Sequence, residues 1–524
     1  MPIRMEQDPQ RPNQNQNRGN NQGGGSGGGL MKILPFILMF LFKKPKLLIP
    51  IVLIGGVLYF LGFFDGCMGE MSQVGYDDTE NSQFSFGATL SEEEFDKAEV
   101  FEPLSSSYGA PRLPAQASLL KYAPNRSHQG NQGSCVGWAS SYAARTILQA
   151  RATGANPNSV TFSPSFLYNQ IALDGCQGAY MRNAMETMHE GGVLPFSKFG
   201  YDERSCSKKP SQSQLQEAQN FRIKGYNRLT ISASDYRPDI QAMKQNLAQG
   251  APVVIGMMVG GTFMQNMMGK KVWNPTQRDY SGYGFSGHAM CVIGYDDNLD
   301  GGSFQIMNSW GPEWGDNGVA WVRYKDFQNF TKEAYGLYPM GSSENMDPNK
   351  LAVKFGLVDN ESQSLIPLRS IGNNSFATTR PLSVGQKFKV AVTNSVESYI
   401  YVFGEESDRS SYVLFPYTEK HSAYCGILGT RVFPKDFSMT PDNIGSRDRI
   451  AVVVSKAELN YKALNDIINS SRQRNYVDKV MDAVRSEAVQ NVKFGTDRDG
   501  AVEFNANLNG KNVVASVIEI DKKG

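Results

Sequence analysis

The sequence has few of the residues on which metal and disulfide chemistry depends. Its 524 residues include six cysteines and four histidines, and no two cysteines are spaced as C-x-x-C. These counts exclude a disulfide-dense scaffold, a zinc ribbon and a dithiol redox motif. The chain also has almost no net charge, because 52 basic residues stand against 51 acidic residues. No basic stretch with interleaved aromatics is present, so we expect no nucleic-acid partner.

The chain does contain enough apolar material for several packed cores. Apolar residues make up 40% of it, which excludes a wholly disordered protein. Its 524 residues are too many for one core. At about 150 residues per domain, we expect three to four structural units.

The N-terminal region changes abruptly from polar to apolar. Residues 1–29 are rich in Asn, Gln and Gly and end in GGGSGGG, which predicts a disordered tail. Residues 30–64 form a predicted membrane segment, in which residues 47–64 carry no charge. As a helix, this run would span about 27 Å, just enough for a bilayer core. The preceding apolar stretch, residues 33–42, is too short to cross and is better read as an interfacial or re-entrant piece.

The charges on either side of residues 47–64 predict their orientation. Lys43, Lys44 and Lys46 precede the run, and acidic residues follow it from Asp65 onward. The positive-inside rule then places the N-terminus in the cytoplasm and the rest of the chain outside it. A buried core helix and the apolar part of a cleaved signal peptide are the alternatives, but no A-x-A cleavage site follows.

Composition divides the remaining chain into four parts. We expect an acidic linker at 65–111, a dense domain at 112–340, a short linker at 341–350 and a β-rich domain at 351–524. The dense domain holds all five tryptophans and four of the six cysteines.

The β-rich domain is predicted from local patterns. Short runs rich in apolar and aromatic residues predict strands around 388–392, 399–403, 411–415 and 450–454. Apolar residues at helical spacing predict a helix behind Asn475, and Asn509-Gly510 is a hairpin turn signal.

Three segments of the dense domain carry the residues with chemical potential. Cys135 follows the polar, glycine-rich loop QGNQGS at the start of a helical pattern, where the helix dipole favours a thiolate. His288 begins an alternating apolar run that predicts a strand, and Asn308 ends the next predicted strand. Because consecutive strands usually neighbour each other, Asn308 is placed to bond one nitrogen of His288 and leave the other facing Cys135.

These three segments, including NSWGPEWGDNG after residue 307, resemble the signature regions of papain-like cysteine peptidases. The resemblance covers residues 113–340 and implies that Cys135 is the nucleophile and His288 its partner in a thiolate–imidazolium pair. It also implies that Asn308 orients the imidazole, that Trp310 shields that bond from water, and that Gln129 supplies the oxyanion hole. The implied fold is α+β and two-lobed, with a helical lobe and a β-barrel-like lobe.

Several positions depart from the family pattern. Val136 stands where the family commonly has tryptophan, and Gln132 stands where it commonly has a cysteine whose partner would be Cys176. Cys206 matches a second family cysteine whose partner is also missing, so Cys176 and Cys206 are free to pair with each other. Ala179 replaces a cleft glycine, which puts substrate backbone binding there in question.

Supporting residues complete the predicted site. The resemblance implies that Gly178 and Ala179 line the substrate side of the cleft, and Ser134 precedes the expected nucleophile. We expect no metal and no cofactor. No long helical propeptide precedes the domain, so the usual zymogen inhibition is not expected.

The resemblances predict a membrane-anchored cysteine endopeptidase acting through a thioester acyl-enzyme. The C-terminal region resembles an accessory domain of unknown function found on bacterial peptidases, so we expect the bacterial inner membrane, with the catalytic domain periplasmic. Expected partners are a peptide or protein substrate, the membrane, and a protein bound by the C-terminal domain. The alternatives are a peptide-binding pseudo-peptidase, an acyl or peptidyl transferase using the same site, and a purely structural envelope protein.

Overall fold

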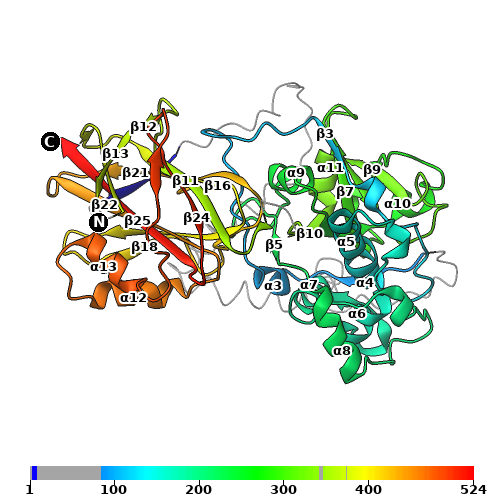
Figure 1. The fold of residues 1–524 in the computed structure, drawn as a ribbon. Coiled ribbons are helices and arrows are strands. Elements are labelled where there is room, and N and C mark those ends of the chain that lie inside the picture. The colour runs from blue at the N-terminus through cyan, green and yellow to red at the C-terminus, as the bar shows by residue number, and fades with distance from the viewer. Residues whose placement is uncertain (1–2, 9–83, 342–345, 373, 524) are drawn as a thin grey trace, which may run out of the picture. The chain divides into compact units, whose positions relative to one another are not determined.

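The computed structural model describes residues 3–8, 84–341, 346–372 and 374–523 (Figure 1). The predicted membrane segment at 30–64 lies outside these ranges. Among the described residues, no helix is both long and apolar enough to cross a membrane. Within the predicted tail, strand β1 (Ile3–Gln7) pairs antiparallel with β21 (Phe437–Pro441), which differs from the prediction of disorder. The prediction averaged over 1–29, whereas the Asn- and Gly-rich stretch begins only after these residues.

The catalytic region, residues 112–340, contains most of the described helices. Its α-helices are α4 (Cys135–Gly137), α5 (Thr146–Thr153), α6 (Pro164–Ile171), α7 (Met181–Glu190), α8 (Gln212–Ala218), α9 (Ile240–Ala248), α10 (Gly261–Gln265) and α11 (Tyr324–Phe330). Its other helical turns are η2 (Leu120–Tyr122), the π-helical η3 (Trp138–Arg145), η4 (Pro157–Ser159), η5 (Asp174–Cys176), η6 (Phe196–Lys198), η7 (Gln219–Phe221) and η8 (Asp279–Ser281).

A seven-stranded antiparallel sheet forms the second half of this region. Its order is β5-β10-β6-β7-β8-β9, and β3 also pairs with β7. The strands are β3 (Gln116–Ser118), β5 (Tyr226–Arg228), β6 (Val253–Val259), β7 (Ser286–Asp296), β8 (Ser303–Met307), β9 (Val319–Arg323) and β10 (Thr331–Leu337). The helix that begins at Cys135 packs against β6 and β7, so one core joins helices and sheet. This confirms the predicted α+β catalytic domain.

The C-terminal domain consists of two eight-stranded sheets and two helices. One sheet has the order β1-β21-β16-β11-β24-β23, joined by β12 and β20, and the other has the order β13-β14-β25-β22-β17-β18, joined by β15 and β19. The strands are β11 (Lys350–Asp359), β12 (Leu365–Ile366), β13 (Leu368–Gly372), β14 (Ser375–Thr378), β15 (Leu382–Ser383), β16 (Phe388–Asn394), β17 (Ser398–Glu405), β18 (Ser411–Phe415), β19 (Tyr424–Cys425), β20 (Gly429–Phe433), β22 (Arg447–Ser455), β23 (Phe494–Thr496), β24 (Val502–Asn507) and β25 (Val513–Lys523). The predicted β-rich domain is thus confirmed.

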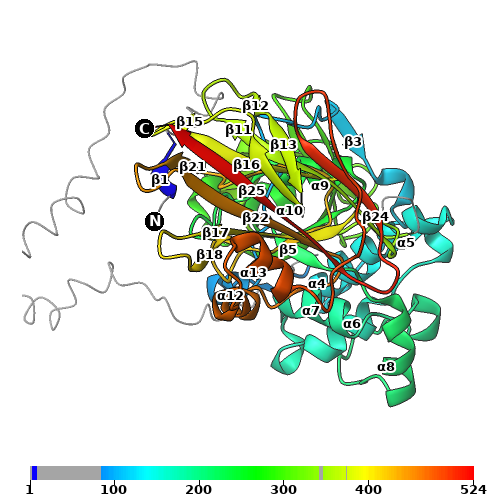
Figure 2. The same ribbon diagram turned by 60° about the vertical axis from the view of Figure 1, so that its left-hand side comes forward.

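Two cores hold this domain together. Apolar residues from both sheets form the first core. The second lies where α12 (Tyr461–Ser470) and α13 (Tyr476–Ala483) cover the other face of the β17–β22–β25 sheet, as Figure 2 shows. The predicted hairpin at Asn509-Gly510 is wrong, because β24 pairs with β11 and β25 pairs with β22 in the other sheet.

The predicted linker at 65–111 contains regular structure in its described part. Strand β2 (Ala88–Thr89) pairs parallel with β4 (Ala179–Tyr180), and helix α3 (Glu92–Asp96) follows. The chain then contacts both larger domains. Arg228 in the catalytic domain donates its backbone N–H to the Glu99 carbonyl at 2.9 Å, and Val100 donates to the Lys420 carbonyl in the C-terminal domain at 2.6 Å.

Candidate active site

Cys135 stands at the first turn of a continuous helical segment formed by α4, η3 and α5. Its side chain is fully buried, and Sγ accepts a hydrogen bond from the Ala289 N–H at 3.3 Å. Ala289 is the neighbour of His288 in β7, so the thiol lies beside the strand that carries the predicted base. This confirms the helix start predicted from the glycine-rich loop.

His288 and Asn308 meet because β7 and β8 are adjacent antiparallel strands. His288 Nε2 lies 2.7 Å from Asn308 Oδ1, and the Ser309 N–H donates to the same oxygen at 2.7 Å. Since Oδ1 is the acceptor, Nε2 carries the proton in the neutral imidazole, and Nδ1 has its lone pair available. Among the described residues, Nδ1 has no hydrogen-bond partner.

Trp310 covers the imidazole as the sequence predicted. Its ring stacks on the His288 ring with centroids 4.3 Å apart and planes inclined by 29°. The indole is 1% exposed, so it keeps water away from the His288–Asn308 hydrogen bond.

Gln129 is held so that its amide group faces the cleft. Ser309 Oγ donates to Gln129 Oε1 at 2.6 Å, which fixes the amide orientation and leaves Nε2 as the donor. Ser134 acts on the same loop, because its Oγ lies 2.6 Å from the Tyr201 hydroxyl, which donates to the Gln129 carbonyl at 2.6 Å. Motif reasoning missed Ser309 and Tyr201. Ser309 lies inside the NSW motif, whereas the sequence gives no signal for Tyr201.

The opposite wall of the cleft contains Gly178 and Ala179. The methyl group of Ala179 does not prevent backbone pairing, because its N–H donates to a carbonyl of the preceding chain at 2.9 Å. The turn before it is closed by a disulfide between Cys176 and Cys206. The pairing that the missing family cysteines left open is therefore formed.

Residues 84–91, which we call the strap, lie in this cleft. The Phe86 carbonyl accepts from Gln129 Nε2 at 3.3 Å, and the Gly87 carbonyl accepts from the Ala179 N–H. The Gly87 N–H donates to Gly287, which precedes His288, at 3.4 Å. The strap thus occupies the oxyanion donor and both backbone edges of the cleft.

Aromatic contacts add to this cover. The Phe84 ring stacks on Trp310 at 4.7 Å, and the Phe86 ring approaches His288 edge-on at 6.3 Å. Trp310 also donates its indole N–H to the Ser85 carbonyl at 2.9 Å. The strap has a sequence signal that the motif search missed, namely the alternation of apolar and small residues in FSFGATL.

The covered site favours neutral side chains. Burial raises the pKa of the Cys135 thiol to about 12, and the Ala289 N–H offsets only part of that rise. Burial also lowers the pKa of His288 to about 4, against the opposing effect of Asn308. The thiolate–imidazolium pair expected from the sequence is therefore not the favoured state while the strap excludes water.

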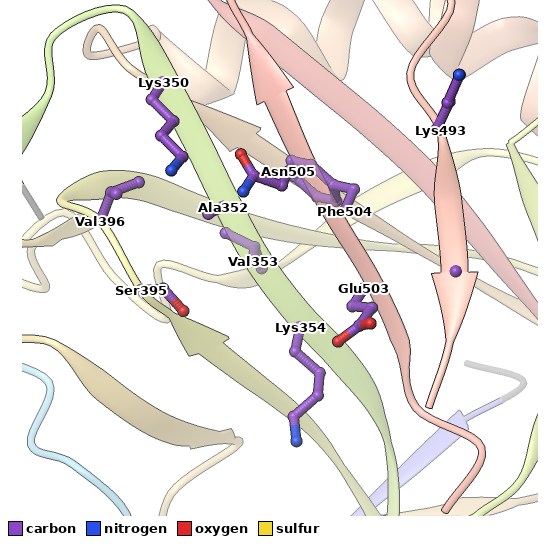
Figure 3. Close-up of a pocket in the computed structure, with 11 residues that line it drawn as sticks. Lys350, Ala352, Val353, Lys354, Ser395, Val396, Lys493, Glu503, Phe504 and Asn505 are labelled. Carbon is purple, nitrogen blue, oxygen red and sulfur yellow. The ribbon is translucent and has the colours of Figure 1, made fainter. Parts of the chain in front are cut away.

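Another concave region lies on the C-terminal domain. A cavity of about 460 Å³ is lined by Lys350 and Lys354 of β11, Glu503 and Asn505 of β24, and Lys493 (Figure 3). Its lining contains neither cysteine nor histidine, so it offers no counterpart to the Cys135 site. Among the described residues, no group of three or more metal-binding side chains is arranged to hold an ion.

Comparisons with known proteins identify relatives of the region that holds Cys135. A family model described as papain family cysteine protease matches residues 121–340. The uncharacterized peptidase C1-like protein L477 of Acanthamoeba polyphaga mimivirus is 30% identical over 214 residues, which are 39% of this chain and 66% of the relative. Cathepsin B-like CP2 of Giardia intestinalis is 28% identical over 202 residues, 36% of this chain and 61% of the relative.

The chain thus spans slightly less than two thirds of the length of these relatives. Among solved structures, xylellain, a cysteine protease from Xylella fastidiosa, matches with 24% identity and a TM-score of 0.40, covering 49% of this chain and 96% of that chain. The family match leaves the C-terminal domain unassigned. Residues 121–340 belong to the papain family of cysteine proteases.

Proposed function

We propose that the protein is a cysteine endopeptidase that hydrolyses peptide bonds at Cys135. One observation carries this proposal. Three segments that are distant in the sequence bring together Cys135, His288, Asn308 and Gln129, and each of these side chains is oriented for its own role in the reaction. Among the described residues, His288 Nδ1 has no hydrogen-bond partner while Asn308 fixes Nε2, and the N–H of the adjacent Ala289 bonds to the Cys135 sulfur, as a base and its nucleophile require.

The mechanism follows from these positions once the strap has left. Cys135 transfers its proton to His288 Nδ1, and the resulting thiolate attacks the substrate carbonyl. Gln129 Nε2 and the Cys135 backbone N–H stabilise the oxyanion, and Ser309 keeps the amide in place. His288 then gives its proton to the leaving amine. Water hydrolyses the thioester and regenerates the thiol.

Two other uses of the site are distinguishable from hydrolysis. A transferase would form the same thioester and resolve it with an amine, so its product would differ. A pseudo-peptidase would form no covalent adduct at Cys135. The complete set of nucleophile, base, orienting amide and oxyanion donor favours turnover over binding alone.

We further propose a single-pass anchor at residues 47–64 that places the catalytic domain outside the cytoplasm of a bacterium. The support is the uncharged run with lysines on one side, together with the Cys176–Cys206 disulfide, which suits an oxidising compartment. Anchoring would raise the concentration of the peptidase near envelope substrates. Protease protection of residues 84–523 in intact spheroplasts would contradict this orientation.

The peptidase proposal is tested by labelling full-length protein in membrane fractions with an electrophilic thiol-peptidase probe. We expect one adduct, at Cys135, and no adduct in Cys135→Ala. Cleavage of a peptide library should disappear in the same variant, while its thermal unfolding stays close to wild type. Retained cleavage in Cys135→Ala would exclude this mechanism, and a folded wild type that never labels would favour the pseudo-peptidase.

A further inference from the structure

Strand β1 binds the C-terminal domain through its backbone and through the carboxyl groups of Glu6 and Asp8. All five of its residues have an antiparallel partner in β21, and β1 forms the outer edge of that sheet (Figure 2). Met5, in the middle of β1, is 40% exposed and belongs to neither core of the domain. A peptide ligand that extends a sheet by one strand binds in this way.

The residue after β1 places its carboxyl group in a polar socket. Asp8 Oδ2 lies 2.6 Å from Lys389 Nζ, and Oδ1 accepts from Ser438 Oγ at 2.6 Å and from Asn360 Nδ2 at 3.3 Å. Burial would raise the pKa of Asp8, but the hydrogen bonds from Lys389 and Ser438 hold it below its usual value. Lys389, Ser438 and Asn360, which we call the Lys389 socket, therefore hold an ionised carboxyl group.

Lys389 requires an anion at this position. The residue is 6% exposed, and its Nζ also donates to the backbone carbonyls of Pro434, Lys435 and Phe437 at 2.9, 2.9 and 2.7 Å. These carbonyls carry no net charge, and among the described residues Asp8 is the only carboxyl group that forms an ion pair with Lys389. A buried ammonium group without a counter-charge is strongly unfavourable. The socket thus suits a carboxylate that arrives with an extended strand.

A second pair of charges matches the first in spacing. Glu6 and Asp8 are two residues apart, so they lie on the same face of an extended strand. Lys387 and Lys389 are also two residues apart, and Glu6 Oε2 lies 3.1 Å from Lys387 Nζ. The side chains of this outer pair are 48% and 37% exposed, so their ion pair contributes little affinity. Asp8 should therefore contribute more to binding than Glu6.

The proposed anchor determines which chain can fill this site. Residues 47–64 lie between β1 and the C-terminal domain in the sequence. If they cross the bilayer once, residues 3–8 stay in the cytoplasm and cannot reach β21 of the same chain or of a second copy. The backbone groups of β21 that pair with β1 are then free, and a free sheet edge readily accepts a strand from another protein. Residues 3–8 show which chemistry this edge accepts.

We propose that the β21 edge and the Lys389 socket bind an extended segment of another extracytoplasmic protein, with an aspartate one residue beyond its paired strand. The segment adds to the sheet antiparallel to β21, as residues 3–8 do. The source of the partner rests on the proposed anchor, whereas the binding chemistry rests on neither the anchor nor the peptidase proposal. The site would hold a partner beside the peptidase without occupying the cleft.

The first test measures binding of a fluorescent peptide with the sequence of residues 2–9, PIRMEQDP, by fluorescence anisotropy. The protein is the full-length chain in detergent with residues 3–8 changed to alternating glycine and serine, which we call the Gly-Ser variant. We expect saturable binding that is at least about thirty-fold weaker when the peptide aspartate is changed to asparagine. Changing the peptide glutamate to glutamine should weaken binding less than about five-fold.

Equal affinities of the aspartate and asparagine peptides, or no binding to the folded protein, would overturn the proposal. Matched variants then assign the aspartate preference to the socket. Lys389→Met should bring the ratio of the two affinities close to one, whereas Lys387→Met should leave it almost unchanged. If Lys389→Met does not fold, Ser438→Ala gives the same test, because the peptide carboxylate loses one donor and the ratio should fall. A ratio that the folded socket variant does not alter would also overturn the proposal.

Intact spheroplasts test whether the edge is free in the anchored protein. The peptide should bind wild type as tightly as the Gly-Ser variant there, because residues 3–8 lie across the membrane. After solubilisation in detergent, residues 3–8 can compete, so the affinity of wild type should fall below that of the variant. Weaker binding by wild type already in spheroplasts would show that residues 3–8 fill the site of their own chain, and would overturn the assignment to another protein.

Binding to the Gly-Ser variant only after lysis would reject the orientation of the anchor and, with it, the extracytoplasmic partner. The peptidase proposal is judged separately, because labelling of Cys135 does not depend on the β21 edge.

Discussion

Replacement of Gly87 by alanine is expected to uncover Cys135. Gly87 has φ of +143°, and a β-carbon there would lie 2.0 Å from the Gly133 carbonyl oxygen. Backbone in such a sparsely populated region costs a residue other than glycine about 1–3 kcal/mol. The collision with a backbone atom cannot be relieved by a rotamer change. The strap can avoid both costs only by leaving the cleft.

A cost of about 2 kcal/mol would raise the open population about thirty-fold. We expect a similar increase in the rate at which a small thiol electrophile labels Cys135 in Gly87→Ala. The rate would be followed by mass spectrometry on full-length protein. Cys291 and Cys425 are buried free cysteines, so their labelling reports unfolding in the same experiment.

The matched control is Gly200→Ala, because a β-carbon at Gly200 meets nothing within 4 Å and no positive φ is involved. Its labelling rate should equal that of wild type. If Gly87→Ala labels no faster than Gly200→Ala while both stay folded, the strap does not limit access to Cys135. The contacts assigned to the strap would then have no role in closing the site.

Two further predictions concern the same site. Ser309→Ala leaves the buried Gln129 Oε1 without its donor, so kcat should fall about ten-fold or more with little change in KM, and an unchanged kcat would refute the positioning role. In Cys135→Ala protein, strap release should take up a proton at His288, whose pKa is about 4 under the strap. It should give up a proton at Glu333, a buried carboxyl group of β10 that accepts from the Ser91 N–H of the strap at 2.9 Å and has a pKa of about 7 while covered. Between pH 6.5 and 4.5 these effects oppose each other, so the rate of hydrogen exchange in the strap, corrected for its intrinsic pH dependence, should change little. In the Glu333→Gln variant only His288 remains, so acidification should increase strap release. Decreased strap release on acidification of this variant would show the sign to be wrong.

The sequence allowed the catalytic residues to be placed because each depends on a short-range rule. Cys135 follows a polar glycine-rich loop that cannot continue a helix, so the helix begins there. Asn308 reaches His288 because consecutive strands pair, and Trp310 follows Asn308 by two residues. The alternation of apolar residues at 388–392 likewise predicted β16, and the continuous apolar run at 450–454 predicted β22, which is buried on both faces.

The same rules fail where long-range pairing decides the structure. Asn509 and Gly510 do adopt positive φ angles, as a tight turn requires, yet the strands beside them enter different sheets. Turn chemistry fixes the local backbone but does not say which partner each strand finds. Residues 84–90 have a strand pattern whose partner, Ala179, lies far along the chain, so composition alone suggested a linker.

The segment that follows the strap connects strap release at the active site with any ligand binding at the C-terminal domain. In this segment the Glu99 carbonyl accepts a hydrogen bond from the Arg228 N–H of the catalytic domain, and the Val100 N–H donates to the Lys420 carbonyl of the C-terminal domain. Any ligand that binds the C-terminal domain and alters these bonds changes the free energy of strap release by its differential affinity for the two states. By reciprocity, occupancy of the cleft by substrate must change the affinity for that ligand by the same factor. A ligand of the C-terminal domain that alters these bonds would therefore be linked thermodynamically to the active site.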